Sequence, residues 1–556
     1  MGRYFTLSKF EFTRNSGLIL FLGLMLLSGC DDSPSSEGLP PNILLIVADD
    51  FGYTDLRAFG GEIDTPNLDA LIENGVTFSR FHTAPFCAVT RAMLLSGNDN
   101  HIAGMGSQDL RTGLFGYEGH LTDRIVTIPQ VLKQAGYSSG VAGKWHLGKQ
   151  PEDLPDRKGF DHSFVLLDGG GNHYSNRGIF PTVPVSHYRE NGDTASWPDG
   201  AYSTDLYTDK LIEYIDEAAG QGKPFFSYAA YTTPHWPLQV DEEYRQKYEG
   251  MYDAGYDALR LKRFNRMKEM GFLREEDELP ELHPRVTPWD SLSVEKQRFE
   301  ARKMELYAGM VDNMDANIGR LMNHLKEIGE FENTVIVFLS DNGAAAEDFY
   351  YHPYFGPFLQ EHYTEEYSKM GSEESFISYG PQWAEAGSSP FKYFKGYTTQ
   401  GGINTPLLIS GPGIEKNGSV VHAFATVMDL APTFYEIAGT AYPDAFGGRE
   451  VYPLRGRSLK SLLSGEQEIV HPTDYVFALE HRGFIQIRKG NWKLVNVERP
   501  FNESNFELYD LSVDRAEQRD VKEVYPEIFQ ELLGEWHAYR DEVKVRIPTP
   551  EPGEGL

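Results

Sequence analysis

Positive charge is scarce in this chain. Its 556 residues include 82 acidic and only 51 basic side chains, which gives a formal net charge of −31 at pH 7. Proteins bind nucleic acids chiefly through basic surface that neutralises the backbone phosphates. The composition therefore argues against nucleic acid as a partner and, more weakly, against a long polyanion as substrate. A single anionic group can still be held where a few cations converge.

Long apolar runs and cysteines are also few. The apolar run at residues 18–27 has about the length of a signal-peptide core and is too short to span a bilayer. The chain has two cysteines, Cys30 and Cys87, so at most one disulfide is possible. Each of the two needs its own explanation.

The first cysteine ends the segment Leu27-Ser28-Gly29-Cys30, which resembles a bacterial lipoprotein cleavage box. This resemblance implies a signal peptide at residues 1–29, a lipid on the Cys30 thiol and a polar tether at residues 30–41. We therefore expect an exported lipoprotein, anchored to the membrane in the periplasm or at the cell surface. The alternative is a plain signal peptide with an incidental cysteine, which also takes the protein out of the cytoplasm.

The remainder of the chain alternates expected strands and helices. Residues 41–48 form a continuous apolar run, which is typical of a strand buried on both faces of a parallel sheet. Further strands are expected at 138–142, 224–230, 334–339 and 405–410, and helices at 66–73, 90–96, 128–135, 204–219, 295–328 and 427–438. This alternation predicts an α/β fold with a mostly parallel central sheet sandwiched by helices.

After about residue 450 the pattern changes. Short strands are expected at 475–479, 484–488 and 492–497, separated by tight turns, and a helix at 526–543 closes the chain. We therefore predict a smaller C-terminal antiparallel sheet packed by a helix. The mature chain is divided accordingly into a large domain of residues 42–450 and a C-terminal α+β subdomain of residues 451–556.

Two stretches do not fit regular elements. Residues 241–292 are highly charged and indicate a helical insertion or surface excursion. Residues 344–390 are rich in Tyr, Phe, Glu and Gly, and a loop of that length is usually a lid or a binding loop. Because its aromatic side chains suit an aryl or sugar face, we expect this segment to line the mouth of a pocket.

Oxygen-bearing side chains follow two of the expected strands. Asp49-Asp50 comes directly after the first strand, and Ser340-Asp341-Asn342-Gly343 follows the strand at 334–339. Open α/β sheets bind ligands at the carboxyl ends of their strands. Adjacent carboxylates repel unless something positive binds them, and hard oxygen ligands suit Ca²⁺ or Mg²⁺. No histidine or thiolate joins these strand ends, so zinc is disfavoured.

Cations and imidazoles lie near three further strand ends. Lys144 and His146, in Gly-Lys-Trp-His-Leu-Gly, are two residues apart, so in an extended loop both side chains point the same way. His235 lies in Thr-Pro-His-Trp-Pro after the strand at 224–230, and Lys395 lies in Phe-Lys-Gly ahead of the strand at 405–410. Taken singly, each motif is explained as well by a turn or by core packing.

The second cysteine opens the stretch Cys-Ala-Val-Thr-Arg-Ala-Met-Leu-Leu-Ser-Gly at residues 87–97. A thiol just ahead of an apolar helical run lies where the helix dipole stabilises an anionic nucleophile. Arg91, one turn further on, can point back at the same spot. For an isolated cysteine, a buried residue at the start of a core helix is the simpler interpretation.

This stretch resembles the sulfatase signature, in which a Cys followed by x-Pro/Ala-x-Arg is converted to formylglycine. Val89 stands where the family usually has Pro or Ala. The other motifs occur in the order seen in type I sulfatases, and residues 81–84, 98–104 and 507–511 are similar to segments of bacterial arylsulfatases and of the family's ending. The resemblance covers residues 42–540 and implies an alkaline-phosphatase-like fold.

The resemblance also implies an activity, which is hydrolysis of sulfate esters of an aryl or saccharide type to inorganic sulfate and an alcohol or phenol. A formylglycine-generating enzyme would convert Cys87 during maturation. With Cys30 lipidated and Cys87 converted, no pair remains for a disulfide. One hydroxyl of the hydrated aldehyde would attack sulfur, and the second would later expel the sulfate.

Roles for the other residues follow from the same resemblance. One Ca²⁺, rather than Mg²⁺, would be bound by the oxygen-bearing side chains and by the modified residue, namely Asp49, Asp50, Asp341, Asn342 and residue 87. Asp341 would also help to deprotonate the nucleophile, while Arg91 and Lys144 would hold it and offset negative charge. His146 would accept the proton of the second hydroxyl, and His235 and Lys395 would hold the sulfate oxygens, either one protonating the leaving oxygen.

Two alternatives stay open at this point. A metal and a clamp for anions also suit phosphonates or phosphate diesters, so the same nucleophile could act on those substrates. A surface lipoprotein that binds sulfated ligands without turnover is the other alternative, and Val89 is its main support. It would have no need of Asp341 and His146 together.

Overall fold

Strand β1 (Asn42–Ala48) lies inside the main sheet, and all of its side chains are buried. The computed structural model describes residues 38–108 and 111–547, and in it β1 pairs in parallel with β10 (Thr334–Ser340) and β9 (Phe225–Ala230). Alternate side chains of a strand point to opposite faces. Leu44 and Ile46 accordingly enter one hydrophobic core, and Leu45 and Val47 enter another. The uninterrupted apolar sequence of β1 results from this burial on both faces.

The main sheet has eleven strands, and most of its pairings are parallel. The strand order is β12-β2-β11-β10-β1-β9-β3-β4-β7-β8, with β13 paired to β2. The remaining strands are β2 (Gly75–His82), β3 (Ser138–Lys144), β4 (His162–Leu166), β7 (Tyr188–Glu190), β8 (Asp193–Thr194), β11 (Asn404–Ser410), β12 (Ser419–Val421) and β13 (Ala425–Thr426). The predicted mostly parallel sheet is confirmed, although β2, β4, β7, β8, β12 and β13 were not expected from the sequence.

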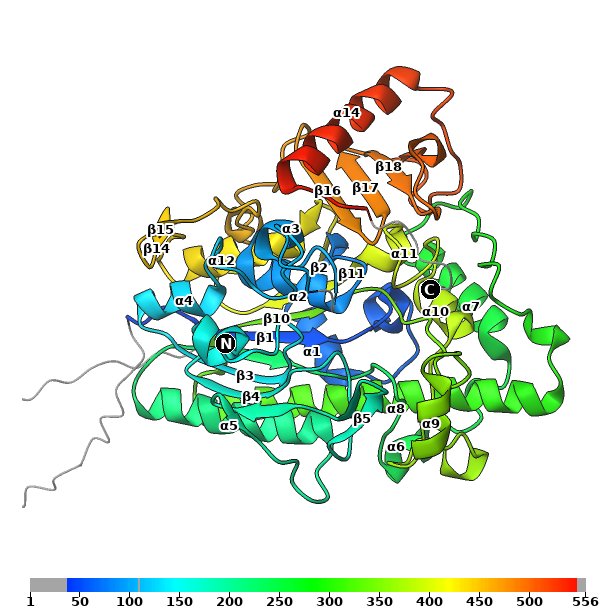
Figure 1. Cartoon of the computed structure of the whole chain (residues 1–556), viewed down its shortest axis with the longest axis horizontal. Coiled ribbons are helices and arrows are strands. Elements are labelled where there is room, and N and C mark those ends of the chain that lie inside the picture. The colour runs from blue at the N-terminus through cyan, green and yellow to red at the C-terminus, as the bar shows by residue number, and fades with distance from the viewer. Residues whose placement is uncertain (1–37, 109–110, 548–556) are drawn as a thin grey trace, which may run out of the picture. The chain divides into compact units, whose positions relative to one another are not determined.

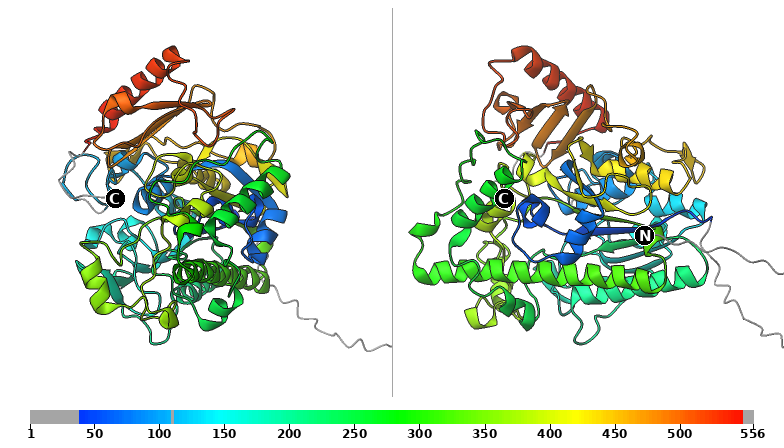
Figure 2. Two further views of the ribbon diagram at one scale, coloured as in Figure 1. Left: turned by 90° about the vertical axis from the view of Figure 1, so that its right-hand side faces the viewer. Right: turned by 180° about the vertical axis from the view of Figure 1, so that it is seen from behind.

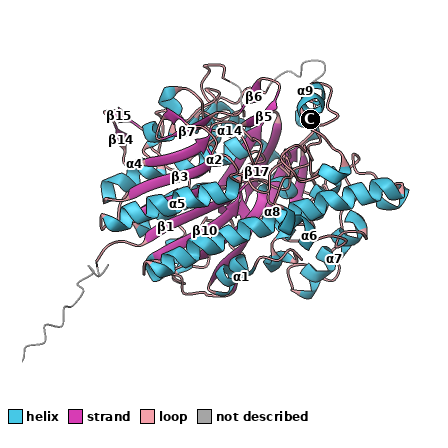
Figure 3. Ribbon diagram, turned by 90° about the horizontal axis from the view of Figure 1, so that it is seen from below, coloured by secondary structure: helices cyan, strands magenta, loops and turns pink. Residues whose placement is uncertain are grey.

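Helices cover both faces of this sheet (Figure 1). On one face lie α1 (Pro66–Glu73), α5 (Ser203–Gly220) and α8 (Val294–Glu327), and Figure 3 shows α5 and α8 running across the strands. On the other face lie α2 (Cys87–Ser96), α4 (Ile128–Leu132) and α12 (Leu430–Ile437). The predicted sandwich is therefore confirmed.

Strand β11 runs against its neighbours, which the alternation of strands and helices did not predict. It pairs antiparallel with both β10 and β2. The chain leaves β10 at its carboxyl end, and residues 341–403 return it to β11 at that same edge of the sheet instead of crossing over to the opposite edge. Lys395 therefore lies at the edge where the parallel strands end, although its own strand begins there.

The C-terminal part forms the expected antiparallel sheet (Figure 2). Its strands are β16 (Val476–His481), β17 (Phe484–Lys489), β18 (Trp492–Asn496) and β19 (Glu507–Asp510), and α14 (Pro526–Val543) packs on them. Its buried side chains, such as Ile487 and Trp536, belong to the same hydrophobic core as α2 and α12. The described residues from 39 to 547 belong to one compact unit. The boundary at residue 450 stays a prediction, as do the signal peptide and tether, because residues 1–37 lie outside the described structure.

The two irregular stretches contain helices. Residues 241–292 include α6 (Glu242–Lys247) and α7 (Gly255–Glu269), in agreement with the helical insertion that the sequence indicated. Residues 344–390 include α9 (Gly356–His362) and α10 (Pro381–Gly387), and Trp383 of α10 is fully buried in a core. This segment is therefore in large part structural. Within the described residues, no helix combines the length and apolarity needed to cross a membrane.

A buried ion pair joins the C-terminal sheet to the main sheet. Lys493 Nζ of β18 lies 2.6 Å from Glu517 Oε1, and neither side chain is exposed to solvent. The second oxygen of Glu517 accepts a hydrogen bond from the backbone N–H of Gln400, whose side chain in turn contacts His82 at 2.9 Å. Burial lowers the pKa of Lys493, and Glu517 opposes this. The charged pair therefore links β18, the segment before β11 and the end of β2.

Removal of one partner should be costly, because it leaves a charge buried without compensation. We expect Glu517→Gln to lower the free energy of unfolding by about 3 kcal/mol, measured by urea denaturation. The double variant Glu517→Gln, Lys493→Met should recover part of this loss. Glu531→Gln, which breaks an exposed pair with Lys489, is the matched control. Equal effects of Glu517→Gln and Glu531→Gln would contradict the role of the buried pair.

Candidate active site

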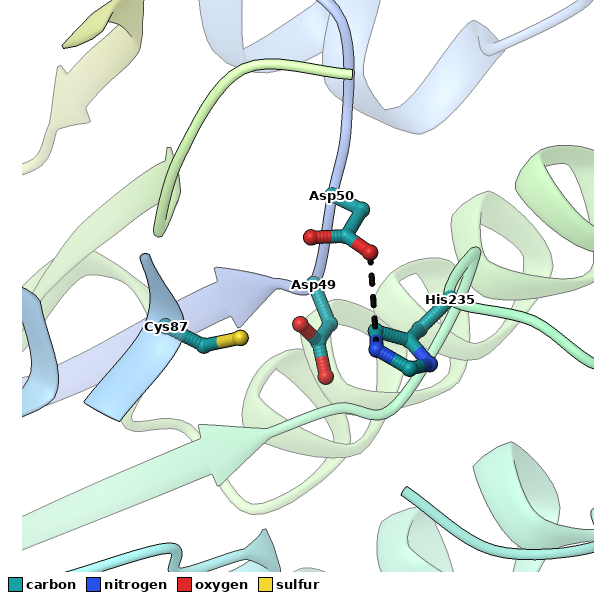
Figure 4. A group of neighbouring side chains, drawn as sticks. All are labelled: Asp49, Asp50, Cys87 and His235. Carbon is teal, nitrogen blue, oxygen red and sulfur yellow. Dashed lines mark ion pairs between the residues drawn. The ribbon is translucent and has the colours of Figure 1, made fainter. Parts of the chain in front are cut away.

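The strand-end motifs meet at one edge of the main sheet. Asp49-Asp50 follows β1, Asp341-Asn342 follows β10, Lys144 ends β3, and Cys87 begins α2 after β2. Figure 4 shows Asp49, Asp50, Cys87 and His235 around a common point, and their ligand atoms all lie within 4.8 Å of one another. The predicted convergence at the carboxyl ends of the strands is therefore observed.

A sharp turn after β1 brings the two adjacent carboxylates together. Successive side chains of an extended strand point to opposite faces. Asp50, however, has a φ of 70°, in the left-handed region that Asp tolerates better than most residues. The chain bends at this residue, and both carboxylates can face the same space. Their burial is nearly complete, at 0% and 1% exposure.

Arg91 and Lys144 hold two of the carboxylates. The Nε and Nη2 atoms of Arg91 lie 2.9 and 2.8 Å from Oδ2 of Asp341, and Nη1 donates to the backbone carbonyl of Lys144 at 2.9 Å. The ammonium of Lys144 lies 2.7 Å from Oδ2 of Asp49. Arg91 therefore does point back from the helix to the strand ends, as its position one turn after Cys87 suggested.

Asp50 has its own partners on the other side. Lys395 Nζ lies 2.7 Å from Oδ1 of Asp50, and the side-chain amide of Asn342 donates to the same oxygen at 2.6 Å. His235 Nε2 lies 3.5 Å from Oδ2. The other ring nitrogen of His235 hydrogen-bonds with the backbone carbonyl of Trp236 at 2.7 Å, which fixes the ring with Nε2 toward the site.

Charge is balanced among these buried side chains. The carboxylates of Asp49, Asp50 and Asp341 face the cations of Arg91, Lys144 and Lys395. Burial raises the pKa of Asp50 and of Asp341, and the neighbouring Asp49 raises that of Asp341 further. Burial works to lower the pKa of Lys395, but Asp50 together with Cys87, Glu347 and Asp49 outweighs it and holds that pKa well above its ordinary value.

Cys87 is the first residue of α2, and only 1% of it is exposed. Burial raises the pKa of its thiol to about 12, and the nearby Lys144 and Lys395 offset this only in part. The thiol is therefore protonated at neutral pH. The expectation that the helix dipole would make Cys87 an anionic nucleophile does not hold for the unmodified side chain, because desolvation outweighs the dipole.

The two histidines lie beside a pair of glycines. A Cβ atom at Gly169 would come within 2.8 Å of His146, and one at Gly170 would come within 3.1 Å of His235. Only residues without a side chain leave room for both rings. His146 has a φ of 55°, so the loop after β3 is not extended there as expected. Burial and repulsion from Lys144 lower the pKa of His235 well below its ordinary value, so that ring is neutral at pH 7.

Sequence reasoning missed these glycines and two other neighbours of the site. Glu347 lies 3.8 Å from the ammonium of Lys395, and the phenol oxygen of Tyr228 lies 3.5 Å from Arg91. The run Gly169-Gly170-Gly171 just after β4 was a usable signal, since such runs mark close approaches. Tyr228 lies inside β9, where an aromatic residue is common, so nothing in the sequence indicated that it lies near the site.

The buried oxygens suit a metal ion. Oδ1 of Asp49 and Oδ1 of Asn342 are both buried and have no hydrogen-bond partner in the described structure. A buried acceptor without a partner is unfavourable, and a cation would satisfy both. Cys87 and His235 also belong to the group, so the expectation that no histidine or thiol joins the carboxylates is wrong. The fold brings Cys87 in from the end of β2 and His235 in from the end of β9. Both are far from Asp49 and Asp50 in the sequence, so their proximity could not be read from it.

Aromatic side chains border the site on the side of His235. The Trp236 ring lies 4.2 Å from the His235 ring and packs edge-on against Phe349 at 4.8 Å between centroids. Phe349 and its neighbours Tyr350, Phe355 and Phe358 belong to one cluster with Trp236. Part of the segment at 344–390 therefore lies next to the site, as its composition suggested.

Comparison with known proteins shows a single family over almost the whole chain. A family model described as Sulfatase matches residues 41–440, and one described as N-sulphoglucosamine sulphohydrolase, C-terminal, matches residues 391–541. An uncharacterized sulfatase of Schizosaccharomyces pombe is 39% identical over 534 residues, which cover 93% of this chain and 96% of the relative. An arylsulfatase of Klebsiella aerogenes is 40% identical over 445 residues, or 79% of this chain and 95% of that protein.

Solved structures agree in fold. The crystal structure of Ps i-CgsB in complex with k-i-k-neocarrahexaose has a TM-score of 0.64 to this chain, with 24% sequence identity. The match covers 90% of this chain and 92% of the other. At this identity the likeness shows a common fold.

Proposed function

The chain belongs to the sulfatase family and is a sulfuric ester hydrolase, and we propose that it works through a formylglycine made from Cys87 together with one bound Ca²⁺. The observation that carries this proposal is the convergence of Cys87 with two carboxylates and a histidine inside a charge-balanced, buried cluster. A formylglycine-generating enzyme would supply the modification. The hydrated aldehyde would then provide a hydroxyl nucleophile and a second hydroxyl for release of sulfate.

The state of Cys87 supports the need for modification. Its thiol is buried and protonated at neutral pH, so it is a poor nucleophile as it stands. Its place at the start of α2 leaves backbone N–H groups and the cations of Lys144 and Lys395 close by. Those groups favour an oxygen nucleophile that carries negative charge.

The charge balance supports a divalent cation. The described carboxylates and cations of the cluster already neutralise one another, so a sulfate group entering alone would add uncompensated negative charge. A calcium ion held by Asp49, Asp50, Asp341, Asn342 and residue 87 would offset it and lower the energy of a developing oxyanion. Ca²⁺ is preferred to Mg²⁺ because the donors are mainly oxygens from a crowded protein cage, where Mg²⁺ usually keeps several waters.

The remaining side chains would orient the reacting groups and transfer protons. Arg91 and Lys144 lie against Asp341 and Asp49 and would hold the nucleophile in place. Asp341, whose pKa is raised, would accept the proton of the attacking hydroxyl, and His146 would accept that of the second hydroxyl. His235 and Lys395 would hold the sulfate oxygens, and either could protonate the leaving oxygen. Lys395 already carries its proton, whereas His235, whose ring is neutral with the proton on Nδ1, would first have to take up a proton on Nε2.

The aromatic border supports an aryl or saccharide substrate. Trp236 and Phe349 offer ring faces and edges next to His235. The solved relative with a bound neocarrahexaose suggests a saccharide, and the arylsulfatase relative suggests an aryl ester. Both remain within one proposed class, sulfate esters of a flat or ring-shaped alcohol.

Export and anchoring are part of the same proposal. The segment before Cys30 would direct the chain out of the cytoplasm, and a lipid on Cys30 would tether it to a membrane in the periplasm or at the cell surface. A hydrolase of external sulfate esters needs such a location. Release of the protein from membranes by a Cys30→Ser substitution would test the anchor.

Maturation of residue 87 is directly measurable. We expect mass spectrometry of peptides from the protein made in its native host to show residue 87 lighter than cysteine by the change from thiol to aldehyde. Cys87→Ala should lower hydrolysis of 4-nitrophenyl sulfate by at least about 10³-fold, since the nucleophile is lost. Unmodified Cys87 in active protein would refute the proposal.

The matured protein can also be used to distinguish sulfatase activity from phosphonate or phosphodiester hydrolase activity. Hydrolysis of 4-nitrophenyl sulfate should be faster than that of a 4-nitrophenyl phosphonate monoester or phosphate diester at equal concentration. A strong preference for the phosphorus compounds would establish the alternative activity. Binding of a sulfate ester without any turnover by matured protein would favour a binding lipoprotein.

The aromatic border can be tested by a point substitution. Deletion of residues 344–390 is unsuitable because α10 is part of the core. We expect Phe349→Ala to raise the KM for the natural substrate by about 10-fold and to change kcat little, since binding is lost in the ground state and transition state alike. Tyr367→Ala, in an exposed part of the same segment, is the control. An unchanged KM in Phe349→Ala would contradict the proposed lining.

A further inference from the structure

Three arginines surround the end of β2 without any acidic partner. They are Arg80 of β2, Arg488 of β17 and Arg515 of the loop after β19. In the part of the chain that the structure describes, none of them forms an ion pair with Asp or Glu, and their contacts are with backbone carbonyls, a histidine and aromatic rings. This is unusual in a chain with 82 acidic residues and a net charge of −31.

Arg488 is the deepest of the three, with 3% of its surface exposed. Its Nε donates to the carbonyl of Gly490 at 3.1 Å, and its Cζ lies 3.9 Å from the centre of the Phe424 ring. Its Nη1 lies 3.4 Å from Nδ1 of His82. Burial lowers the pKa of His82 well below its ordinary value, so the ring is neutral and brings no negative charge to the guanidinium.

Arg515 also contacts β2. Its Nη2 donates to the backbone carbonyl of Ser79 at 3.0 Å, and its Nη1 lies 3.5 Å from the carbonyl of Phe272. The guanidinium is therefore held next to the residue that precedes Arg80. Exposed His422 also contacts Ser79, through its Oγ at 2.7 Å.

Arg80 lies at a bulge in β2. Between the pairs Phe78–Leu407 and Phe81–Thr405, two residues of β2 oppose one residue of β11. Such bulges redirect a side chain. Arg80 is half-buried, and its Nε is buried without a hydrogen-bond partner in the described structure. Its guanidinium has no hydrogen bond or ion pair to any described residue.

The arrangement is unfavourable unless something negative joins it. Burial lowers the pKa of Arg488, and repulsion from Arg80 and Arg515 lowers it further, to about 9, although Glu517, which is already paired with Lys493, opposes this. Burial and then Arg515 lower the pKa of Arg80 as well. With a pKa of about 9, Arg488 stays charged at neutral pH, so its positive charge is held close to those of Arg80 and Arg515 in partly desolvated surroundings.

We propose that Arg80, Arg488 and Arg515 form a second anion-binding site that takes a free tetrahedral oxyanion of the sulfate type. Guanidinium groups present paired N–H donors that match the oxygens of such ions. Because Arg488 is almost fully buried, a small free ion can reach it more readily than a group attached to a saccharide. Sulfate is the oxyanion that this enzyme class releases.

This site is separate from the one at Cys87. In the strand order, β11 and β10 lie between β2 and β1. Three spacings of about 4.8 Å put the strand of Arg80 roughly 14 Å from the strand that ends at Asp49 and Asp50. Within the described residues, none of the three arginines forms a hydrogen bond or ion pair with a side chain of the Cys87 cluster. The cations at Cys87 are matched by carboxylates, whereas those at the end of β2 are not. The second site therefore needs an anion to balance it, and binding there would stabilise the fold.

Crystals soaked in selenate would locate the ion directly. We expect an anomalous selenium peak between the three guanidinium groups in the wild-type protein, and its loss in Arg80→Gln. A peak at Cys87, if present, should be the same in both proteins. The absence of a peak between the arginines of the wild type would overturn the proposal, whether or not the Cys87 site is occupied.

Thermal unfolding gives a second, independent test with sodium sulfate as the probe and sodium chloride of equal ionic strength as reference. Without sulfate, Arg80→Gln should unfold at the same temperature as the wild type or higher, because it loses no contact and relieves repulsion. At sulfate concentrations about a hundred times Kd, the wild type should gain about 2–3 °C more than Arg80→Gln.

Arg320→Gln is the matched control. It also removes one positive charge, but from α8, where Arg320 forms an exposed pair with Asp209 of α5. It should show the full wild-type gain in sulfate. An equal gain in Arg80→Gln and the wild type would refute the site. A Tm of Arg80→Gln that falls equally in both salts would show a purely structural role and would also refute it.

Discussion

The structure depends most on the balance of buried charge at the carboxyl edge of the main sheet. Three carboxylates and three cations are held there almost without exposure to solvent, on ends of separate strands and on α2. A single unmatched charge in such a place is strongly unfavourable. The strand register, the turn at Asp50 and the position of α2 are therefore all constrained by the same electrostatic requirement. The same balance supports our proposal that a divalent cation enters with an anionic substrate group.

Much of this arrangement was predictable from the sequence. Apolar runs located β1, β9 and β10, and polar motifs directly after them indicated the site, because parallel strands end at a common edge. The helix α14 and its sheet followed from ordinary helix and turn signals. What local pattern could not give was the direction of β11, which depends on where residues 341–403 return the chain.

Other features could not be predicted because they depend on contacts between distant residues. The joining of His235 and Cys87 to the carboxylates requires three strand ends to meet in space. The raised pKa of Cys87 results from burial, which no local pattern reveals. The arginines at the end of β2 come from segments more than 400 residues apart, and each alone is an ordinary strand or loop residue. The two cationic clusters differ chiefly in whether carboxylates accompany them.

We propose that the cluster at Cys87 accepts a divalent cation and a sulfate group together. The most direct measurement is isothermal titration of metal-free, matured protein with Ca²⁺, without sulfate and with saturating sulfate. The account predicts one Ca²⁺ site that includes Asp49 and Asp50, with a lower Kd for Ca²⁺ when sulfate is present. It would be contradicted by a Ca²⁺ affinity that sulfate does not change, or by the absence of Ca²⁺ binding in active protein.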